Sequence, residues 1–192
     1  MTNRIFDKTE SLPLSGHMLV STNRGEDARL RETVCLILQH GSDGSTGLVL
    51  NRELGDDFDS LLHHLSPTPS KRIGHIHFGG PASGPIVALH NHEHLAEAWA
   101  GAGVYLAARL DKLQAALEIE SGEVRILVGH LQWAAGALEK ELYAGQWMPL
   151  PATPELVFAP NEEMWLRSIR AVGDRFITLI SGAQPIANAQ WN

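Results

Sequence analysis

The stretch at residues 32–51 constrains the fold more than any other part of the sequence. It contains two apolar, β-prone runs, at 34–38 and 48–50, with the turn-forming cluster Gly-Ser-Asp-Gly-Ser between them at 41–45. Two such runs joined by a short polar link predict a β-hairpin. Because the runs are nearly continuous in apolar residues, we expect both strands to be largely buried. The hairpin should therefore form the structural centre of the domain.

Shorter segments on either side of the hairpin predict further strands and helices. We expect strands at 17–22, 73–78, 86–90, 104–107, 124–128 and 156–158, and a strand or extended segment at 176–180. We expect helices at 56–65, 111–120, 133–144 and 162–172. Strands that come in pairs early and alternate with helices later indicate an α/β or α+β fold, a compact mixed β-sheet with flanking helices. We expect a single domain at 16–192, preceded by a flexible arm at 1–15.

The composition narrows the class of protein. The chain has 192 residues, a formal net charge of −7 and one cysteine, and no apolar run approaches the roughly 20 residues that a membrane span needs. The negative charge disfavours direct binding to DNA. Cys35 lies in an apolar run, which is typical of a buried core residue. We expect a cytoplasmic protein that has no disulfide and does not enter a membrane.

Ten histidines raise the question of a metal site. His75 and His77 are two residues apart, as are His90, His92 and His94, so each set could place imidazoles on one face of a strand. The chain has no His-Glu-x-x-His pattern, and no carboxylate can be assigned to orient these rings. We therefore expect no metal and no cofactor.

Asn51 and Arg52 are the first candidates for ligand binding, because they follow a buried strand and should lie at an edge of the sheet. The guanidinium of Arg52 could hold a phosphate or carboxylate through two hydrogen bonds. The alternative is that Asn51 completes a turn and Arg52 pairs with a nearby acid.

Gly79, Gly80 and His90 complete the candidate ligand site. The Gly-Gly-Pro sequence at 79–81 could let a ligand approach the backbone, although it lacks the Lys-Ser/Thr of a phosphate-binding loop. The alternative is a structural turn. If Asn51 and Arg52 join these three residues in one cleft, the protein could be an enzyme, either a hydrolase or a nucleotide-binding protein.

A family resemblance emerges from motifs spread over residues 16–173. They are Gly-His-Met-Leu-Val at 16–20, Thr-Val at 33–34, His40, Gly-Leu-Val-Leu-Asn-Arg at 47–52, Gly-Gly-Pro at 79–81, Leu-His at 89–90, Gly129, Trp133, Gly136, Leu138, Glu139, Glu141, Trp147 and Trp165. In their order and spacing they resemble the YqgE/AlgH family of bacterial proteins. The resemblance implies a mixed α/β fold without a recognised DNA-binding motif. It also implies an unassigned biochemical function, apart from one branch named as a regulator of alginate production and transcription.

The chain departs from the family pattern at four positions. It has Glu53 where the family has Pro, Leu38 where Cys is common, His130 where Tyr is favoured, and Ala137 where Gln is favoured. A thiol-based activity, or a role for that Tyr or Gln, is therefore not transferred to this chain.

Two hypotheses for function follow. The first is a non-enzymatic regulator that affects transcription indirectly, through contacts with an unknown protein or small ligand. The second is the enzyme with a cleft at the five candidate residues. The sequence does not determine the partner or the oligomeric state.

Overall fold

A computed structural model of the chain describes residues 14–22, 24, 30–54, 76–119 and 121–181. The expected helix at 56–65 and most of the expected arm lie outside these ranges. The elements are β1 (His17–Ser21), β2 (Val34–Gly41), β3 (Gly44–Val49), β4 (Ile76–Phe78), β5 (Val87–His90), the 3-10 turn η3 (Glu93–Leu95), β6 (Ala98–Gly101), β7 (Val104–Ala107), α2 (Leu110–Glu118), β8 (Val124–Val128), β9 (Leu131–Ala134), α3 (Ala137–Tyr143), β10 (Trp147–Pro151), α4 (Pro154–Val157) and α5 (Asn161–Ser181).

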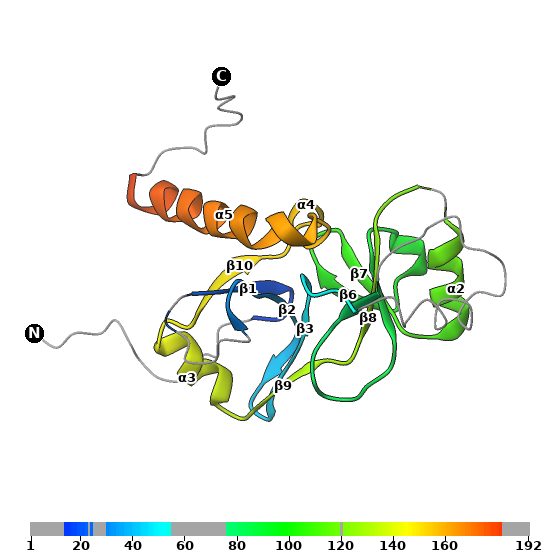
Figure 1. Cartoon of the computed structure of the whole chain (residues 1–192), viewed down its shortest axis with the longest axis horizontal. Helices are drawn as coiled ribbons and strands as arrows, with labels where there is room; N and C mark the ends of the chain where they lie inside the picture. Colours follow the sequence, from blue (N-terminus) through cyan, green and yellow to red (C-terminus); the bar gives the residue numbers. More distant parts are fainter. Residues whose placement is uncertain (1–13, 23, 25–29, 55–75, 120, 182–192) are drawn as a thin grey trace, which may run out of the picture.

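The strands form two five-stranded sheets, which Figure 1 shows side by side. The first sheet has the order β10-β1-β2-β3-β9 and is antiparallel throughout. The second has the order β4-β8-β5-β7-β6 and is mixed, because β4 and β8 pair in parallel. With helices flanking both sheets, the chain has the α+β fold that the sequence predicts.

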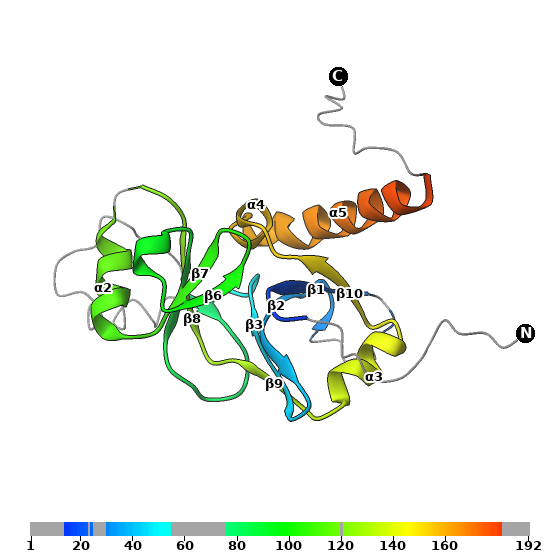
Figure 2. The same cartoon turned by 180° about the vertical axis from the view of Figure 1, so that it is seen from behind.

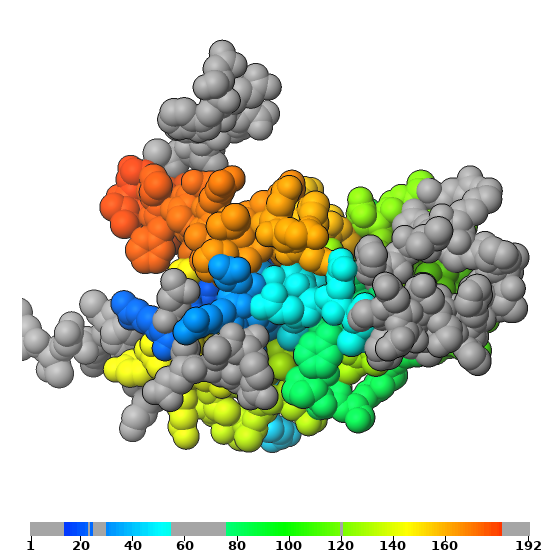
Figure 3. Space-filling model, in the orientation of Figure 1, coloured from blue at the N-terminus to red at the C-terminus, as the bar shows by residue number. Residues whose placement is uncertain are grey.

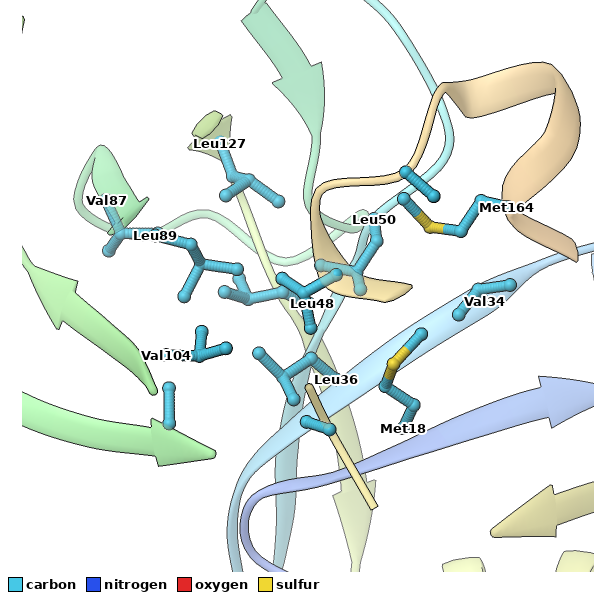
Figure 4. Close-up of a cluster of buried hydrophobic side chains, with 14 residues drawn as sticks. Met18, Val34, Leu36, Leu48, Leu50, Val87, Leu89, Val104, Leu127 and Met164 are labelled. Carbon is cyan, nitrogen blue, oxygen red and sulfur yellow. The ribbon is translucent and has the colours of Figure 1, made fainter. Parts of the chain in front are cut away.

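Three helices cover the outer faces of this pair of sheets. Figures 1 and 2 show α3 and α5 on opposite sides of the first sheet, and α2 beside the second. The main hydrophobic core lies between the sheets and is closed by α4 and the start of α5. Figure 4 shows this core, in which Leu36 and Leu48 from the first sheet meet Leu89 and Leu127 from the second.

The predicted hairpin is present as β2 and β3, and both of its faces are buried. Leu36 and Leu48 point into the main core, whereas Cys35, Ile37 and Val49 point into a second cluster that packs under α3. This alternation follows from the two-residue period of a strand. The continuous apolar run is therefore explained by the helix on one face and the second sheet on the other.

The expected helix at 133–144 is wrong in its first part. Trp133 and Ala134 belong to β9, and α3 begins only at Ala137. Between them Gly136 has a φ of 72°, a left-handed conformation that separates the strand from the helix. The apolar spacing through Leu138 and Leu142 hid this turn, because a period that fits a helix does not show where the helix starts.

Two other expectations near the C-terminus are also wrong. The expected strand at 156–158 overlaps α4, which begins with Pro154 at the position where proline favours a helix. The expected extended segment at 176–180 is the last part of α5. Gly173 lies inside this helix, where a glycine costs about 1 kcal/mol relative to alanine but does not terminate it.

Candidate functional site

Asn51 lies directly after β3 and uses its side-chain amide to hold the start of β2. Its Oδ1 accepts a hydrogen bond from the Val34 backbone N–H at 3.0 Å, and its Nδ2 donates to the Glu32 carbonyl at 2.7 Å. Glu32 has a φ of 51°, an uncommon conformation for a residue with a side chain. The side-chain amide of Asn51 thus fixes a strained turn, which corresponds to the structural alternative to ligand binding at this residue.

Arg52 lines a cavity of about 470 Å³. Its Nη2 donates to the Arg31 carbonyl at 2.6 Å and to Thr33 Oγ1 at 3.3 Å, which fixes the direction of the guanidinium. Nine described residues line the cavity: Leu30, Thr33, Val49, Arg52, Glu53, Leu54, Phe78, Pro81 and Leu131. We call this the Arg52 cavity. Six of these residues are apolar, and Arg52 and Glu53 supply the charges.

Gly79 and Gly80 run beside the Arg52 cavity as closely packed backbone. Gly79 accepts a hydrogen bond from the Val49 N–H and donates to the Val128 carbonyl, both at 2.7 Å, so it joins the two sheets. A Cβ added to Gly79 would lie 2.3 Å from the Gly129 carbonyl oxygen, and one added to Gly80 would lie 2.2 Å from the backbone of His130. Glycine at these two positions therefore allows the backbone at 79–80 to pass close to the backbone at 129–130.

His90 lies on β5 in the second sheet and does not line the Arg52 cavity. Its side chain is fully buried, and its Nδ1 accepts a hydrogen bond from the His92 N–H at 3.3 Å. Burial lowers the pKa of His90 to about 4, with a further lowering from His92 and His94 and an opposing effect of Glu97. His90 is thus a neutral ring near pH 7.

The structure therefore separates the five candidate residues. Arg52 lines the cavity, Gly79 and Gly80 border it, Asn51 holds the neighbouring turn, and His90 lies in the other sheet. A single cleft formed by all five is not what the geometry gives. Within the described residues, no group of three or more His, Cys, Asp or Glu side chains is placed to hold a metal ion.

The sequence interpretation missed Arg125, the centre of a buried polar cluster between β3 and α5. Its Nη1 donates to the Leu50 carbonyl at 2.9 Å and to Asn161 Oδ1, and its Nη2 donates to the Ala159 carbonyl at 2.9 Å. Burial lowers the pKa of Arg125 to about 10, so the side chain keeps its charge at neutral pH. The sequence did contain a signal for this cluster, namely an arginine inside the apolar run at 124–128. A charge buried in such a run needs hydrogen-bond partners.

Asn161 extends this cluster to the rim of the Arg52 cavity. Its Nδ2 donates to Glu53 Oε1 and to His77 Nε2, the latter at 3.2 Å. The other ring nitrogen of His77 lies 3.3 Å from the Ile126 carbonyl, which can only accept, so we assign the ring proton to Nδ1. The first residue of α5 thereby positions one of the two charged side chains that line the cavity.

A second missed cluster lies under α3 and contains a serine, a histidine and a carboxylate. His40 Nδ1 lies 2.7 Å from Ser45 Oγ, and His40 Nε2 lies 3.8 Å from Glu139 Oε1. The order matches that of a nucleophile, a base and an orienting acid. However, 3.8 Å is too long for a hydrogen bond, and Ser45 is only 5 % exposed. The sequence signal for this cluster was the position of His40 and Ser45 at the two ends of the hairpin turn, where they pair directly across the two strands.

Two tryptophans of the first sheet form hydrogen bonds to α3. Trp133 and Trp147 both donate their indole N–H to Glu141 Oε2, at 3.0 and 2.7 Å. Cys35 packs in the same region, and burial raises the pKa of its thiol far above its usual range. The thiol therefore has little tendency to form the reactive thiolate.

Within the residues described, no helix combines the length and apolar content that a bilayer crossing requires.

Comparison with known proteins extends the resemblance over most of the chain. The AlgH-like family model matches residues 18–177. A UPF0301 protein of Rhodospirillum rubrum is 33 % identical over 153 residues, covering 76 % of this chain and 79 % of that protein. A UPF0301 protein of Chlorobium chlorochromatii is 27 % identical over 176 residues, covering 84 % of this chain and 88 % of its own.

Two solved structures share the fold. The solution structure of the AlgH protein from Pseudomonas aeruginosa aligns with a TM-score of 0.70 at 24 % identity, covering 95 % of this chain and all of that one. The crystal structure of a Corynebacterium diphtheriae protein aligns with a TM-score of 0.67 at 23 % identity, covering 85 % and 89 %. Because the family model covers residues 18–177 and a relative is 33 % identical over 153 residues, this chain belongs to the AlgH-like family.

Proposed function

We propose that this protein is a non-enzymatic binding protein that holds a small anionic molecule with an apolar body in the Arg52 cavity. In this proposal, ligand binding alters its contacts with other proteins, through which it affects transcription indirectly. The observation that carries the proposal is the cavity itself, which measures about 470 Å³ and is lined by six apolar residues and by Thr33, Arg52 and Glu53. Sites for small molecules have this size and this composition.

The charges around the cavity favour an anionic group on the ligand. Arg52 is held by two acceptors on Nη2, so the rest of its guanidinium is oriented in advance. Glu53 would oppose an anion, but its carboxylate accepts from Asn161 and lies close enough to Arg125 to interact electrostatically. Because Glu53 is partly compensated in this way, Arg52 supplies the stronger field. A carboxylate or phosphate would bind there through charge-assisted hydrogen bonds.

The balance of charges also supports an indirect effect on transcription. A formal net charge of −7 opposes sequence-independent attraction to DNA, which arises mainly from contacts with phosphates. Among the described residues that line the Arg52 cavity, Thr33 and Glu53 are the candidates for a nucleophile or base. The Thr33 hydroxyl donates to the Arg31 carbonyl and accepts from Arg52. The Glu53 carboxylate accepts from Asn161, so both groups are engaged in structural hydrogen bonds. Binding without chemistry is therefore the function that the cavity supports best.

A thermal-shift screen of small carboxylates and phosphates, with and without apolar groups, tests this proposal. A ligand at 100 times its dissociation constant should add about 2.7 kcal/mol of stability. Arg52→Met should abolish the shift, whereas Arg167→Met, a change on the exposed face of α5, should retain it. The proposal is overturned if no compound stabilises the wild type, or if both variants respond as the wild type does.

The cluster of His40, Ser45 and Glu139 contains the residue types of a serine hydrolase, which is the second candidate to test. Ser45 is among the residues that line a separate cavity of about 540 Å³. If the 2.7 Å contact activates Ser45, a fluorophosphonate probe should label the wild type and not Ser45→Ala. We expect no labelling, because the serine is almost fully buried and its histidine lacks a close acid. Labelling that depends on both Ser45 and His40 would favour the enzyme.

A further inference from the structure

Helix α5 carries an apolar stripe beside the face that packs on the main core. One member of this stripe, Phe176, also lines a cavity of about 460 Å³ with Leu14 and Met148. The core-facing side of the helix is buried through Met164 and Ser168, which are completely inaccessible. The stripe consists of Leu166, Ile169, Gly173, Phe176, Ile177 and Ile180, of which Ile169 is half-buried and the others are exposed. Four of its large side chains remain 50–78 % exposed. Exposed apolar groups that line up in this way mark an interaction surface.

The spacing of the stripe is that of a helix which pairs with another helix. Leu166, Ile169, Gly173, Phe176 and Ile180 follow one another at intervals of three, four, three and four residues. This repeat of 3.5 residues is the a/d pattern of coiled coils. A helix that only covers a globular core needs apolar residues on one face. Here the two residues that are buried against the core, Met164 and Ser168, lie outside the heptad stripe.

The stripe is also nearly symmetric about Gly173, which indicates the identity of the partner. Counted outward from Gly173, Leu166 and Ile180 lie seven residues away on either side, and Ile169 and Ile177 lie four residues away. An antiparallel copy of the same helix would therefore place Leu166 on Ile180 and Ile169 on Ile177. By the same count, Phe176 of one copy would lie beside Arg170 of the other. Such self-complementarity is the property of a two-fold interface.

Gly173 and the charges beside the stripe fit the same arrangement. A Cβ added to Gly173 would meet nothing within 4 Å, so the helix surface is open at the centre of the stripe. Two helices that cross there can approach closely. On one flank, Arg170 and Asp174 lie on opposite sides of that centre. In an antiparallel pair, Arg170 of each copy would lie within reach of Asp174 of the other, giving two equivalent ion pairs.

We propose that two copies of this chain associate through α5, antiparallel and with the two-fold axis at Gly173. The contact covers only a few helical turns, so it lies at the small end of specific interfaces, below about 1,200 Å². The association is therefore weak and reversible, with a dissociation constant in the micromolar range or above. The surface is separate from the Arg52 cavity, and the pairing does not depend on the ligand proposed for that cavity.

Sedimentation equilibrium of the full chain, from micromolar to near-millimolar concentration, tests the pairing. The wild type should show a monomer–dimer equilibrium. Ile177→Glu and Leu166→Glu should each weaken it about tenfold or more, because they place a charge in an apolar contact. Tyr143→Glu is the matched control, since Tyr143 is 97 % exposed on α3, outside the stripe, and this variant should dimerise as the wild type does.

Two further variants separate pairing from folding and fix the register. Gly173→Glu replaces a glycine by a good helix former, so its Tm should not fall, whereas dimerisation should be lost because two like charges meet at the axis. Arg170→Glu should weaken the dimer, and Arg170→Glu combined with Asp174→Lys should restore it. A wild type that remains monomeric throughout, stripe variants that dimerise normally, or a double variant that fails to recover would each overturn the proposal.

Discussion

The two halves of α5 have the same secondary structure but different surroundings. In the first half, Arg125 bonds to Asn161, Met164 is fully buried, and the Trp165 indole donates to the Ser21 carbonyl at 3.0 Å. In the second half, Phe176 is 64 % exposed and Leu179 is 73 % exposed. Figure 3 shows the last turns of the helix, in orange and red, standing out at one end of the molecule.

This difference separates what the fold requires from what it leaves available. A helix of 21 residues is about 32 Å long, and its buried residues, Met164 and Ser168, both lie in the first half. If the second half of α5 served only to stabilise the fold, the side chains that it exposes to solvent would be polar. The second half instead exposes four large apolar side chains, Phe176, Ile177, Leu179 and Ile180, beside the charged Asp174 and Arg175, so its sequence fits contact with another surface. Mutations in the two halves should therefore affect different properties.

The largest effect is expected at Arg125, which attaches the first half to the sheets. Arg125→Met removes the donor from three acceptors, the Leu50 and Ala159 carbonyls and Asn161 Oδ1. We expect the free energy of unfolding to fall by about 3–5 kcal/mol, measured by urea denaturation. Arg52→Met, a partly exposed arginine with fewer partners, should cost less than about 1 kcal/mol. Equal losses in the two variants would contradict the structural role of Arg125.

The comparison is tested most directly by truncating one apolar side chain in each half. Met164→Ala creates a cavity in the main core and should destabilise the protein by about 2–4 kcal/mol. Ile177→Ala removes a side chain that is 65 % exposed and should change the stability by no more than about 0.5 kcal/mol. Both are measured below the concentration at which copies associate. A large loss in Ile177→Ala would mean that the second half also belongs to the core.

Lowering the pH should destabilise the protein through His90, which lies in the second sheet and belongs to neither half of α5. The pKa of His90 is lowered from 6.5 to about 4, so the unfolded chain takes up a proton at a higher pH than the folded one. The stability from this residue is therefore complete above pH 6.5 and is lost as the pH falls toward 4, by about 1–3 kcal/mol.

His90→Asn keeps a hydrogen-bond acceptor for the His92 N–H but removes the titration. In this variant the free energy of unfolding should change less between pH 7 and 4 than in the wild type. Met164→Ala should keep the wild-type pH dependence, because it alters no titrating group. An unchanged acid response in His90→Asn would show that other groups produce it.

The smallest effect is expected for an ion pair on the exposed surface of the first half. Arg167 and Glu163 are one turn apart and 2.5 Å from each other, but both side chains are about half exposed. Arg167→Ala should cost only about 0.3–0.5 kcal/mol, and less in high salt. A loss above about 1 kcal/mol that persists in high salt would show that Arg167 has a further role in holding the first half.

The hairpin was predictable because its information is local. Apolar runs at 34–38 and 48–50 with a glycine-rich turn between them indicate two buried strands, whatever packs on them. Arg52 was predictable as a candidate for the same reason, since it follows directly from the end of the second run. His90 was grouped with it only by residue type, and burial in the second sheet separates the two.

The sequence by itself determined that the class is α/β or α+β, and it determined the central hairpin and the family to which the chain belongs, because these depend on local periodicity and on motif order. Only the tertiary structure decided that Arg125 and Asn161 connect the hairpin to α5, and that Asn161 bonds to Glu53 at the cavity rim. These contacts join residues between 36 and 108 positions apart. Their partners are chosen by the packing of two sheets and a helix, and no local pattern encodes that packing.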